Sequence, residues 1–546
     1  MKTERLHTLI LLLAALFLLQ PLSAANVYSQ PDTLQSAGFR RGMDAYRAGS
    51  YKDAVKQWKA AAADGDAMAQ CNLGACYFTG KGVKQNYRKA LKWFRRSAAQ
   101  GNDMAQCNIA NCYMKGYGVR QDIDEAIKWY MLSAEQGNAM AMTTLGNCYL
   151  QGEGVEADEA KGFDYLYKAA EKDYPVAWNG LGDCFYFGTG VTQSSDEAFY
   201  WYSKAAEQGV KEAQYNLAVC YAYGDGAVQD DEKAVLWYGK AAGQGHVKAQ
   251  FSLAECYYNG VGVAPDTAQA AKWYEKAAEQ GDVDAQYLLA GLYYEGKGVE
   301  ENHYISAKWY EKAAKSGDPD AINQLAGCYY WGDGVPYNYE KAIRLYEKAA
   351  GLGNAEAMYY LAEYEFFEDE ETGAYTAFEW YSKSAELGYA PAYNQLGNCY
   401  YVGVEGHIDY EEAVKWYRMG ADAGDPDAQY NLALCYYLGT GVGQDFLAAA
   451  RWYIRAAEQG KVEAQYFLGQ MFYKGQGVQQ SYEEAVSWYA KAAEKEYPAA
   501  QYDLGICYYY GKGVEMNRSK ARELWRAAAE QDYEDAFNAL MDFGKE

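Results

Sequence analysis

The chain has 546 residues and a formal net charge of -24 at pH 7, because 74 acidic residues outnumber 50 basic ones. Lysine and arginine are dispersed among aspartate and glutamate, which excludes the clustered basic surface that nucleic-acid phosphates require. Aromatic residues make up 16% of the chain, with 57 tyrosines, so a disordered acidic tail is excluded and many rings must be packed. The negative charge mainly keeps a long surface soluble.

Residues 1–25 are predicted to be a secretory signal peptide. Two basic residues precede an unbroken apolar run from Leu9 to Leu19, and small residues end the segment. This run is shorter than the roughly 20 residues that a membrane-spanning helix needs. We therefore expect an exported protein, periplasmic or extracellular, without a stable membrane anchor, and a short linker at residues 26–32.

Residues 33–68 contain the stretch AYRAGSYKDAVKQW, which lacks the glycine-rich insertion found in the rest of the chain. This segment resembles an ordinary tetratricopeptide hairpin. We expect it to cap the N-terminal end of the array that follows.

Residues 69–535 consist of one unit repeated thirteen times, with a step of 36 residues, or 35 in one case. A period of this length predicts a solenoid, in which each unit packs only against its neighbours. Residues 536–546 supply one further, C-terminal capping helix. The units begin at Ala69, Ala105, Ala141, Ala177, Ala213, Ala249, Ala285, Ala321, Ala357, Ala392, Ala428, Ala464 and Ala500, with a truncated copy at Ala536.

Each unit predicts two helices, and positions are counted here from its first alanine. Apolar residues spaced by three and four over the first twelve positions indicate a helix, and a Gly-x-Gly-Val stretch then reverses the chain. A second helix follows, because position 18 holds a helix-capping residue. These residues are Asn86, Asp122, Asp158, Ser194, Asp230, Asp266, Asn302, Asn338, Asp409, Asp445, Ser481 and Asn517.

The repeat at residues 357–391 is irregular. It is one residue short, and its expected loop, from Glu363 to Gly373, carries an acidic run in place of Gly-x-Gly-Val. Such a run is typical of a solvated loop; the alternative is a functional break where the array changes curvature or a basic partner docks.

The pattern A-x-x-x-L-G-x-x-Y-x-x-G-x-G-V, followed by A-x-x-W-Y-x-K-A-A-x-x-G, covers nearly the whole chain after the signal peptide. It resembles the Sel1-like repeat of the tetratricopeptide-like superfamily. The resemblance implies an all-α fold, an α/α right-handed superhelix of helix-turn-helix repeats. It also implies a non-catalytic role, since Sel1-like proteins commonly act as adaptors in assembling complexes.

Cysteine and tryptophan recur with the period of the fold. Ten of the twelve cysteines occupy position 8, and equivalent positions on stacked helices are too far apart for disulfides, so the cysteines are interpreted as buried apolar residues. Tryptophan recurs at position 25, and we assign it to the core between the helices. Tyrosine at position 9 and alanine at positions 22 and 29 are predicted to join it.

Positions 3, 7, 10 and 11 of the first helix line the concave surface of tetratricopeptide-like superhelices. Position 3 is small or polar early in the chain and aromatic later, and position 10 is often tyrosine. These rings suit binding of an extended peptide or a carbohydrate; alternatively, they only shield the backbone. The candidate ligand-binding residues are Tyr215, Phe251, Tyr287, Tyr359, Tyr430, Tyr466 and Tyr502 at position 3, and Tyr258, Tyr294, Tyr330, Tyr437 and Tyr473 at position 10.

No catalytic constellation accompanies these repeats. After the signal peptide only His246, His303 and His407 occur, they do not cluster, and no metal, nucleotide or nucleophile motif is present. We therefore expect no catalytic residue, no metal and no cofactor. The predicted function is an exported scaffold that binds a peptide segment or protein partner in its concave groove. The alternative is a carbohydrate-binding or sugar-active envelope protein that uses the same surface.

Overall fold

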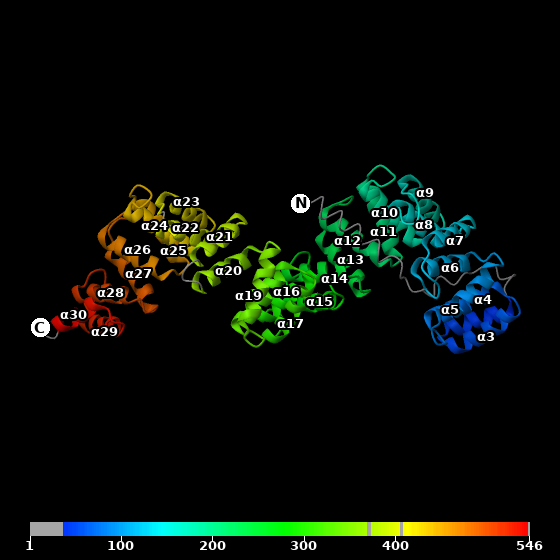
Figure 1. The fold of residues 1–546 in the computed structure, drawn as a ribbon, viewed down its shortest axis with the longest axis horizontal. Coiled ribbons are helices and arrows are strands. Elements are labelled where there is room, and N and C mark those ends of the chain that lie inside the picture. The colour runs from blue at the N-terminus through cyan, green and yellow to red at the C-terminus, as the bar shows by residue number, and fades with distance from the viewer. Residues whose placement is uncertain (1–35, 369–372, 405–407, 544–546) are drawn as a thin grey trace. The chain divides into compact units, whose positions relative to one another are not determined.

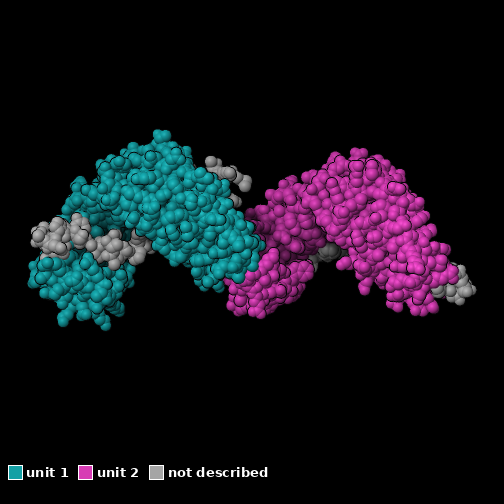
Figure 2. Space-filling model, turned by 180° about the vertical axis from the view of Figure 1, so that it is seen from behind, with its two compact units in different colours: residues 1–282 teal, residues 283–546 magenta. Residues whose placement is uncertain are grey.

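The computed structural model describes residues 36–368, 373–404 and 408–543. These residues form twenty-nine α-helices and no strand (Figure 1). The chain divides into two units, Met1–Asp282 and Val283–Glu546, which Figure 2 colours separately. The segments predicted as signal peptide and linker, residues 1–25 and 26–32, lie outside the described residues.

In both units each helix packs against the next along the chain, so that successive pairs form stacked hairpins and confirm the predicted all-α solenoid of hairpins. In the first unit the first helices are α2 (Ala37–Arg47), α4 (Ala67–Thr79), α6 (Asp103–Lys115), α8 (Ala139–Gln151), α10 (Pro175–Phe187), α12 (Lys211–Tyr223) and α14 (Val247–Asn259). Their second helices are α3 (Tyr51–Ala63), α5 (Tyr87–Ala98), α7 (Ile123–Glu135), α9 (Glu159–Ala170), α11 (Ser195–Glu207), α13 (Asp231–Gly243) and α15 (Thr267–Glu279).

The second unit continues the same alternation. Its first helices are α16 (Val283–Glu295), α18 (Pro319–Trp331), α20 (Ala355–Glu368), α22 (Ala390–Val402), α24 (Pro426–Leu438), α26 (Val462–Lys474) and α28 (Pro498–Tyr510), followed by the terminal α30 (Glu534–Phe543). Its second helices are α17 (His303–Lys315), α19 (Tyr339–Gly351), α21 (Gly373–Glu386), α23 (Tyr410–Asp422), α25 (Phe446–Glu458), α27 (Tyr482–Glu494) and α29 (Arg518–Ala529).

The start of the second helix is fixed by the residue at position 18. All twelve predicted capping side chains accept a backbone N–H from the first turn of that helix, as Asn86 does from Lys89 at 2.9 Å. This bond satisfies one of the amide groups that a helix start leaves without an intrahelical acceptor. The prediction of a capped second helix in every full-length repeat is thus confirmed.

The two glycines of the Gly-x-Gly-Val loop have different structural roles. Gly224 ends α12 in the left-handed region, with φ of 75°. Gly226 also has a positive φ, 71°, and a Cβ placed there would lie 2.1 Å from the carbonyl oxygen of Ser195, in the second helix of the preceding repeat. The second glycine therefore lets the loop touch its neighbour, and the loop is a joint between hairpins as well as a turn.

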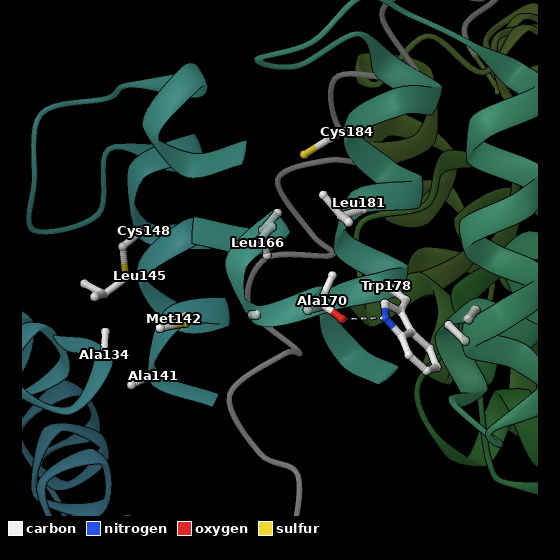
Figure 3. Packing of buried hydrophobic residues seen from close by; sticks show 14 of the residues in the cluster. Ala134, Ala141, Met142, Leu145, Cys148, Leu166, Ala170, Trp178, Leu181 and Cys184 are labelled. Carbon is white, nitrogen blue, oxygen red and sulfur yellow. Dashed lines mark hydrogen bonds between the residues drawn. The ribbon is translucent and has the colours of Figure 1, made fainter. Parts of the chain in front are cut away.

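The core lies between the paired helices and is built on the ring at position 26. Tyr130, Tyr274 and Tyr453 are among the largest fully buried side chains, and alanines at positions 1, 22 and 29 surround such rings. Figure 3 shows part of the core cluster in the first unit, where the indole N–H of Trp178 donates to the carbonyl of Ala170 at 3.1 Å. Small residues thus let the helices approach while one large side chain fills each layer, a ring in most repeats and Leu166 in the repeat beginning at Ala141.

Most of the tryptophans at position 25 differ from the prediction, because they pack against the core rather than inside it; Trp309, only 8% exposed, is buried as predicted. Trp129, Trp201 and Trp237 are only partly buried beside the buried clusters. Where a basic residue follows three positions later, its side chain covers the outer face of the ring, as where Lys240 Nζ lies 3.5 Å from the Trp237 ring centroid. Trp129 is followed by Leu132 instead, and its indole N–H donates to Glu125 at 3.0 Å. Position 26 is one residue further around the helix and takes the central place.

The irregular repeat differs from its expected outline. The sequence predicts a loop from Glu363, but α20 continues to Glu368, because no glycine ends it at the position where Gly332 ends α18. Residues 369–372, which include the rest of the acidic run, lie outside the described residues.

Candidate binding surface on the first helices

The first helices of successive repeats approach one another within each unit. α8 contacts α10, and α22 contacts α24, across the intervening second helix. Side chains join them directly: the amide of Asn216 on α12 donates to Asn179 on α10 at 3.1 Å, and Asn431 on α24 donates to Asn394 on α22 at 2.9 Å. We call the side chains at positions 3, 4, 7, 10 and 11 of these helices the first-helix surface.

The aromatic residues at position 3 pack on their own hairpins. Each of the seven rings is partly buried and contacts the ring at position 26, with centroids 5.7 to 6.5 Å apart. Burial raises the pKa of Tyr359 and Tyr430 to about 12, so both hydroxyls stay protonated and can donate. These rings therefore cover the core, and only part of each contributes to the first-helix surface.

The tyrosines at position 10 connect neighbouring repeats. Tyr437 bonds Gln476 of the next Gly-x-Gly loop at 3.1 Å, and the Lys512 ammonium, at the equivalent position, donates to the Tyr473 hydroxyl at 2.6 Å. Tyr330 is also partly buried. Tyr258 and Tyr294 are more open, with 39% and 43% of their surface exposed. Position 10 thus combines a joint between hairpins with a partly accessible ring.

Position 7 links the core to this surface through hydrogen bonds. The buried hydroxyl of Tyr202 donates to Asp183 at 2.8 Å, and the amide of Asn216 from the next repeat donates to the same carboxylate at 3.2 Å. The pKa of Asp183 is raised to about 7, mainly by burial; the hydrogen bond from Tyr202 opposes the rise, and the nearby charge of Glu212 adds to it. The corresponding residue in a later repeat is a neutral amide, Asn398, which accepts from Tyr417 at 2.8 Å.

The most exposed apolar side chains of the first-helix surface lie at position 11. Tyr223 is 74% exposed, Trp331 68% and Tyr510 62%, and Val402 and Leu438 are exposed at the same position. Position 11 is among those predicted to line the concave surface, but none of the candidate ligand-binding residues lies there. The signal is a large apolar residue directly before the glycine that ends the first helix, where no later turn covers it.

The described residues offer little for metal or redox chemistry. No group of histidine, cysteine, aspartate and glutamate among them could hold a metal ion. All twelve cysteines are free thiols, and all except the partly buried Cys256 are buried. Burial raises the pKa of Cys184 to about 12 and of Cys435 to about 11, so these thiols remain protonated near neutral pH. No described helix is long and apolar enough to span a membrane.

Stacked hairpins joined by glycine loops define a helical-repeat scaffold. Within that class the chain belongs to the Sel1 repeat family, whose model matches thirteen segments. They are residues 67–102, 103–138, 139–174, 176–210, 211–246, 247–282, 283–318, 319–354, 355–389, 390–425, 426–461, 462–497 and 498–533.

Several solved structures are similar to the chain. A protective antigen of uropathogenic Escherichia coli with an SLR fold is 32% identical, with a TM-score of 0.52, and the match covers 89% of this chain and 97% of that one. A Sel1 repeat protein from Oxalobacter formigenes is 32% identical over 63% of this chain and 98% of its own, with a TM-score of 0.41. An immunity protein from Pseudomonas aeruginosa is 25% identical over 39% and 81%, with a TM-score of 0.30. The comparison with curated proteins gave no match.

Proposed function

We propose that this Sel1 repeat scaffold is an exported, non-catalytic protein that binds an extended segment of a partner protein on its first-helix surface. The observation that carries the proposal is the exposed apolar residue at position 11, which recurs in the second unit at Trp331, Val402, Leu438 and Tyr510. Exposed apolar side chains on the second helices are scattered over many positions instead. Glu295 and Lys474 are charged at this position, but Val402 and Leu438 occupy it on successive first helices, and apolar residues repeated in this way suit an extended chain.

Export is proposed from the sequence of residues 1–25 and from one comparison. The similar Escherichia coli protein is a protective antigen, which supports a location accessible from outside the cell. N-terminal sequencing of the protein purified from native cells should find a mature chain beginning near Asn26. A chain that retains Met1 would contradict export through this segment.

Photo-crosslinking in native cells tests the binding surface. The photoreactive residue p-benzoyl-phenylalanine replaces Trp331 or Tyr510 on first helices and, as matched controls of similar exposure, Tyr304 or Leu447 on second helices. We expect adducts to one partner protein from the first-helix positions and few from the controls. Equal adducts from both sets, or none from Trp331 and Tyr510, would contradict the proposal.

A further inference from the structure

Acidic and aromatic side chains lie together on the first helices α16, α18 and α20 of the second unit. Tyr287 is on α16, Asp320 lies in the first turn of α18, and Glu356 and Tyr359 are on α20. Two buried amides hold the carboxylates in place: Asn354 donates to Asp320 at 2.8 Å, and Asn323 donates to Glu356 at 2.8 Å. We call Tyr287, Asp318, Asp320, Glu356 and Tyr359 the acidic–aromatic surface.

These groups face a common region. Burial, followed by the charges of Asp320, Glu356 and Asp318, raises the pKa of the Tyr287 hydroxyl. Burial, and then the charge of Glu356, likewise raises the pKa of Tyr389, which ends this stretch. The capping residue of α18, a residue of its first turn and a residue of α20 therefore place three carboxylates near one ring.

The negative charge of this surface has no partner within the described chain. In the described residues neither Asp318, Asp320 nor Glu356 forms an ion pair. The side-chain oxygen of Asn323, a residue only 3% exposed, also receives no hydrogen bond. Carboxylates beside aromatic faces without a cation are a receptor for an ammonium or guanidinium group.

Four repeats later, the equivalent positions contain a lysine whose ammonium group contacts the carboxylates and the ring. Asp427, Tyr430, Lys461 and Glu463 occupy the positions that Asp284, Tyr287, Asp318 and Asp320 occupy four repeats earlier. The Lys461 ammonium lies 2.6 Å from Asp427, 3.3 Å from Glu463 and 5.8 Å from the centroid of the Tyr430 ring. In the earlier repeat the residue at the lysine position is Asp318, so a carboxylate stands where the chain elsewhere supplies its own cation.

We propose that the acidic–aromatic surface binds a lysine or arginine side chain of an extended peptide segment, placed as Lys461 is placed over Tyr430. The inference rests on the proposed function and specifies the chemistry of the partner. A metal ion is a poorer occupant, because no metal-holding group is found in the described residues and the aromatic faces favour an organic cation. The cation of the partner then supplies the positive charge that the solenoid lacks at this site.

Fluorescence anisotropy of the full chain with the labelled peptide Ala-Lys-Ala-Lys-Ala tests this inference. The variant Asp320→Asn/Glu356→Gln should bind the peptide about tenfold more weakly, since each lost carboxylate removes a charge-assisted contact. Gln at position 356 still accepts from Asn323, so the fold is preserved, and thermal unfolding by circular dichroism checks this. The peptide with both lysines acetylated should not bind to the unaltered chain.

A second double variant is matched in charge. Asp427→Asn/Glu463→Gln removes two carboxylates that Lys461 already neutralises, so it should change peptide binding less than twofold. Lys461→Gln should free the site formed by Asp427, Tyr430 and Glu463. The apparent association constant should then roughly double, because each chain offers the peptide two similar sites. Equal weakening by both double variants, or no change on Lys461→Gln, would overturn the inference in favour of non-specific attraction to net charge.

The two proposals can fail separately. If the natural partner crosslinks through Trp331 and does so equally well in the Asp320→Asn/Glu356→Gln variant, the acidic–aromatic surface is wrong while the scaffold function stands. If the peptide binds as described but no partner crosslinks to any first helix, the cation site stands and the proposed function is wrong.

Discussion

The early repeats and the late repeats share one core but present different first-helix surfaces. Cys71, Cys107, Thr143 and Asn179 at position 3 are small and buried, whereas Tyr430 and the six other aromatic residues at this position in later repeats are larger and partly exposed over the same buried ring. In two later repeats position 3 is again small and buried, at Asn323 and Asn394. The hairpin accommodates both choices without a change in its helices. Variation at position 3 therefore alters what the solenoid presents, while position 26 holds each hairpin together.

The largest effect is expected when the buried ring at position 26 is removed from one early repeat and from one late repeat. Tyr130→Ala, beside Cys107, and Tyr453→Ala, beside Tyr430, should each lower the free energy of unfolding by about 3 to 5 kcal/mol, because each leaves a cavity of similar size. Urea unfolding followed by far-UV circular dichroism measures this. A clearly larger loss for Tyr453→Ala would show that the ring at position 3 contributes to folding as well.

Substitution of the second glycine of the loop should destabilise the protein to the same extent in both units. Gly226→Ala should lower the free energy of unfolding by about 2 kcal/mol or more, because the new Cβ would meet the Ser195 carbonyl and the backbone has a positive φ. Gly441→Ala in the second unit should behave alike, since its Cβ would lie 2.1 Å from the Tyr410 carbonyl.

Gly224→Ala is the matched control for the joint. Its backbone is also left-handed, but the nearest atom to a Cβ there is 3.5 Å away, so only about 1 kcal/mol is expected. If Gly224→Ala and Gly226→Ala cost the same in urea unfolding, the close contact between repeats does not matter for stability.

A smaller difference separates the hydroxyls of the two buried tyrosines. Tyr130 donates to Asn111 at 2.5 Å, whereas the buried Tyr453 hydroxyl has no hydrogen-bond partner among the described residues. Tyr130→Phe should therefore cost about 1 kcal/mol, and Tyr453→Phe should be neutral or stabilising. The midpoints of urea unfolding give the comparison, and a costly Tyr453→Phe would refute it.

A further test concerns the charge at position 7, and its effect depends on pH. The folded-state pKa of Asp183 is about 7, above its ordinary value, so the folded chain binds the proton more tightly. Its contribution to stability is fully present below about pH 4 and is lost as the pH rises through 7. Asp183→Asn, which copies Asn398, should melt at a higher temperature than the unaltered chain at pH 8, and the difference should shrink towards pH 4. A pH-independent difference would contradict this.

The period of the sequence predicts the hairpins and their caps well, because both depend on residues close in the chain. Asn86 and its eleven counterparts cap second helices through local bonds, so residue type and spacing suffice. The burial of Tyr453 rather than Trp452 could not be predicted in this way, since adjacent helical residues differ only in the direction they face.

The surface is less predictable, because it depends on contacts between repeats. Nothing in the residues around Tyr437 indicates that its hydroxyl meets Gln476 in the next loop. The pairing of Lys461 with Asp427 and Glu463, and the absence of such a base at Asp318, likewise emerge only when first helices are placed side by side. The candidate residues at positions 3 and 10 thus stay a prediction about binding.

Because the thiols are buried only in the folded state, the protein is protected from unwanted disulfides only after it has folded. The folded solenoid buries eleven of its twelve thiols, whereas an extended chain offers all twelve at once for random crosslinking. Each cysteine-containing hairpin that packs on its neighbour therefore removes its thiols from contact with oxidants. In an oxidising compartment, rapid local closure would therefore protect the polypeptide before any enzyme that forms disulfides could act on it.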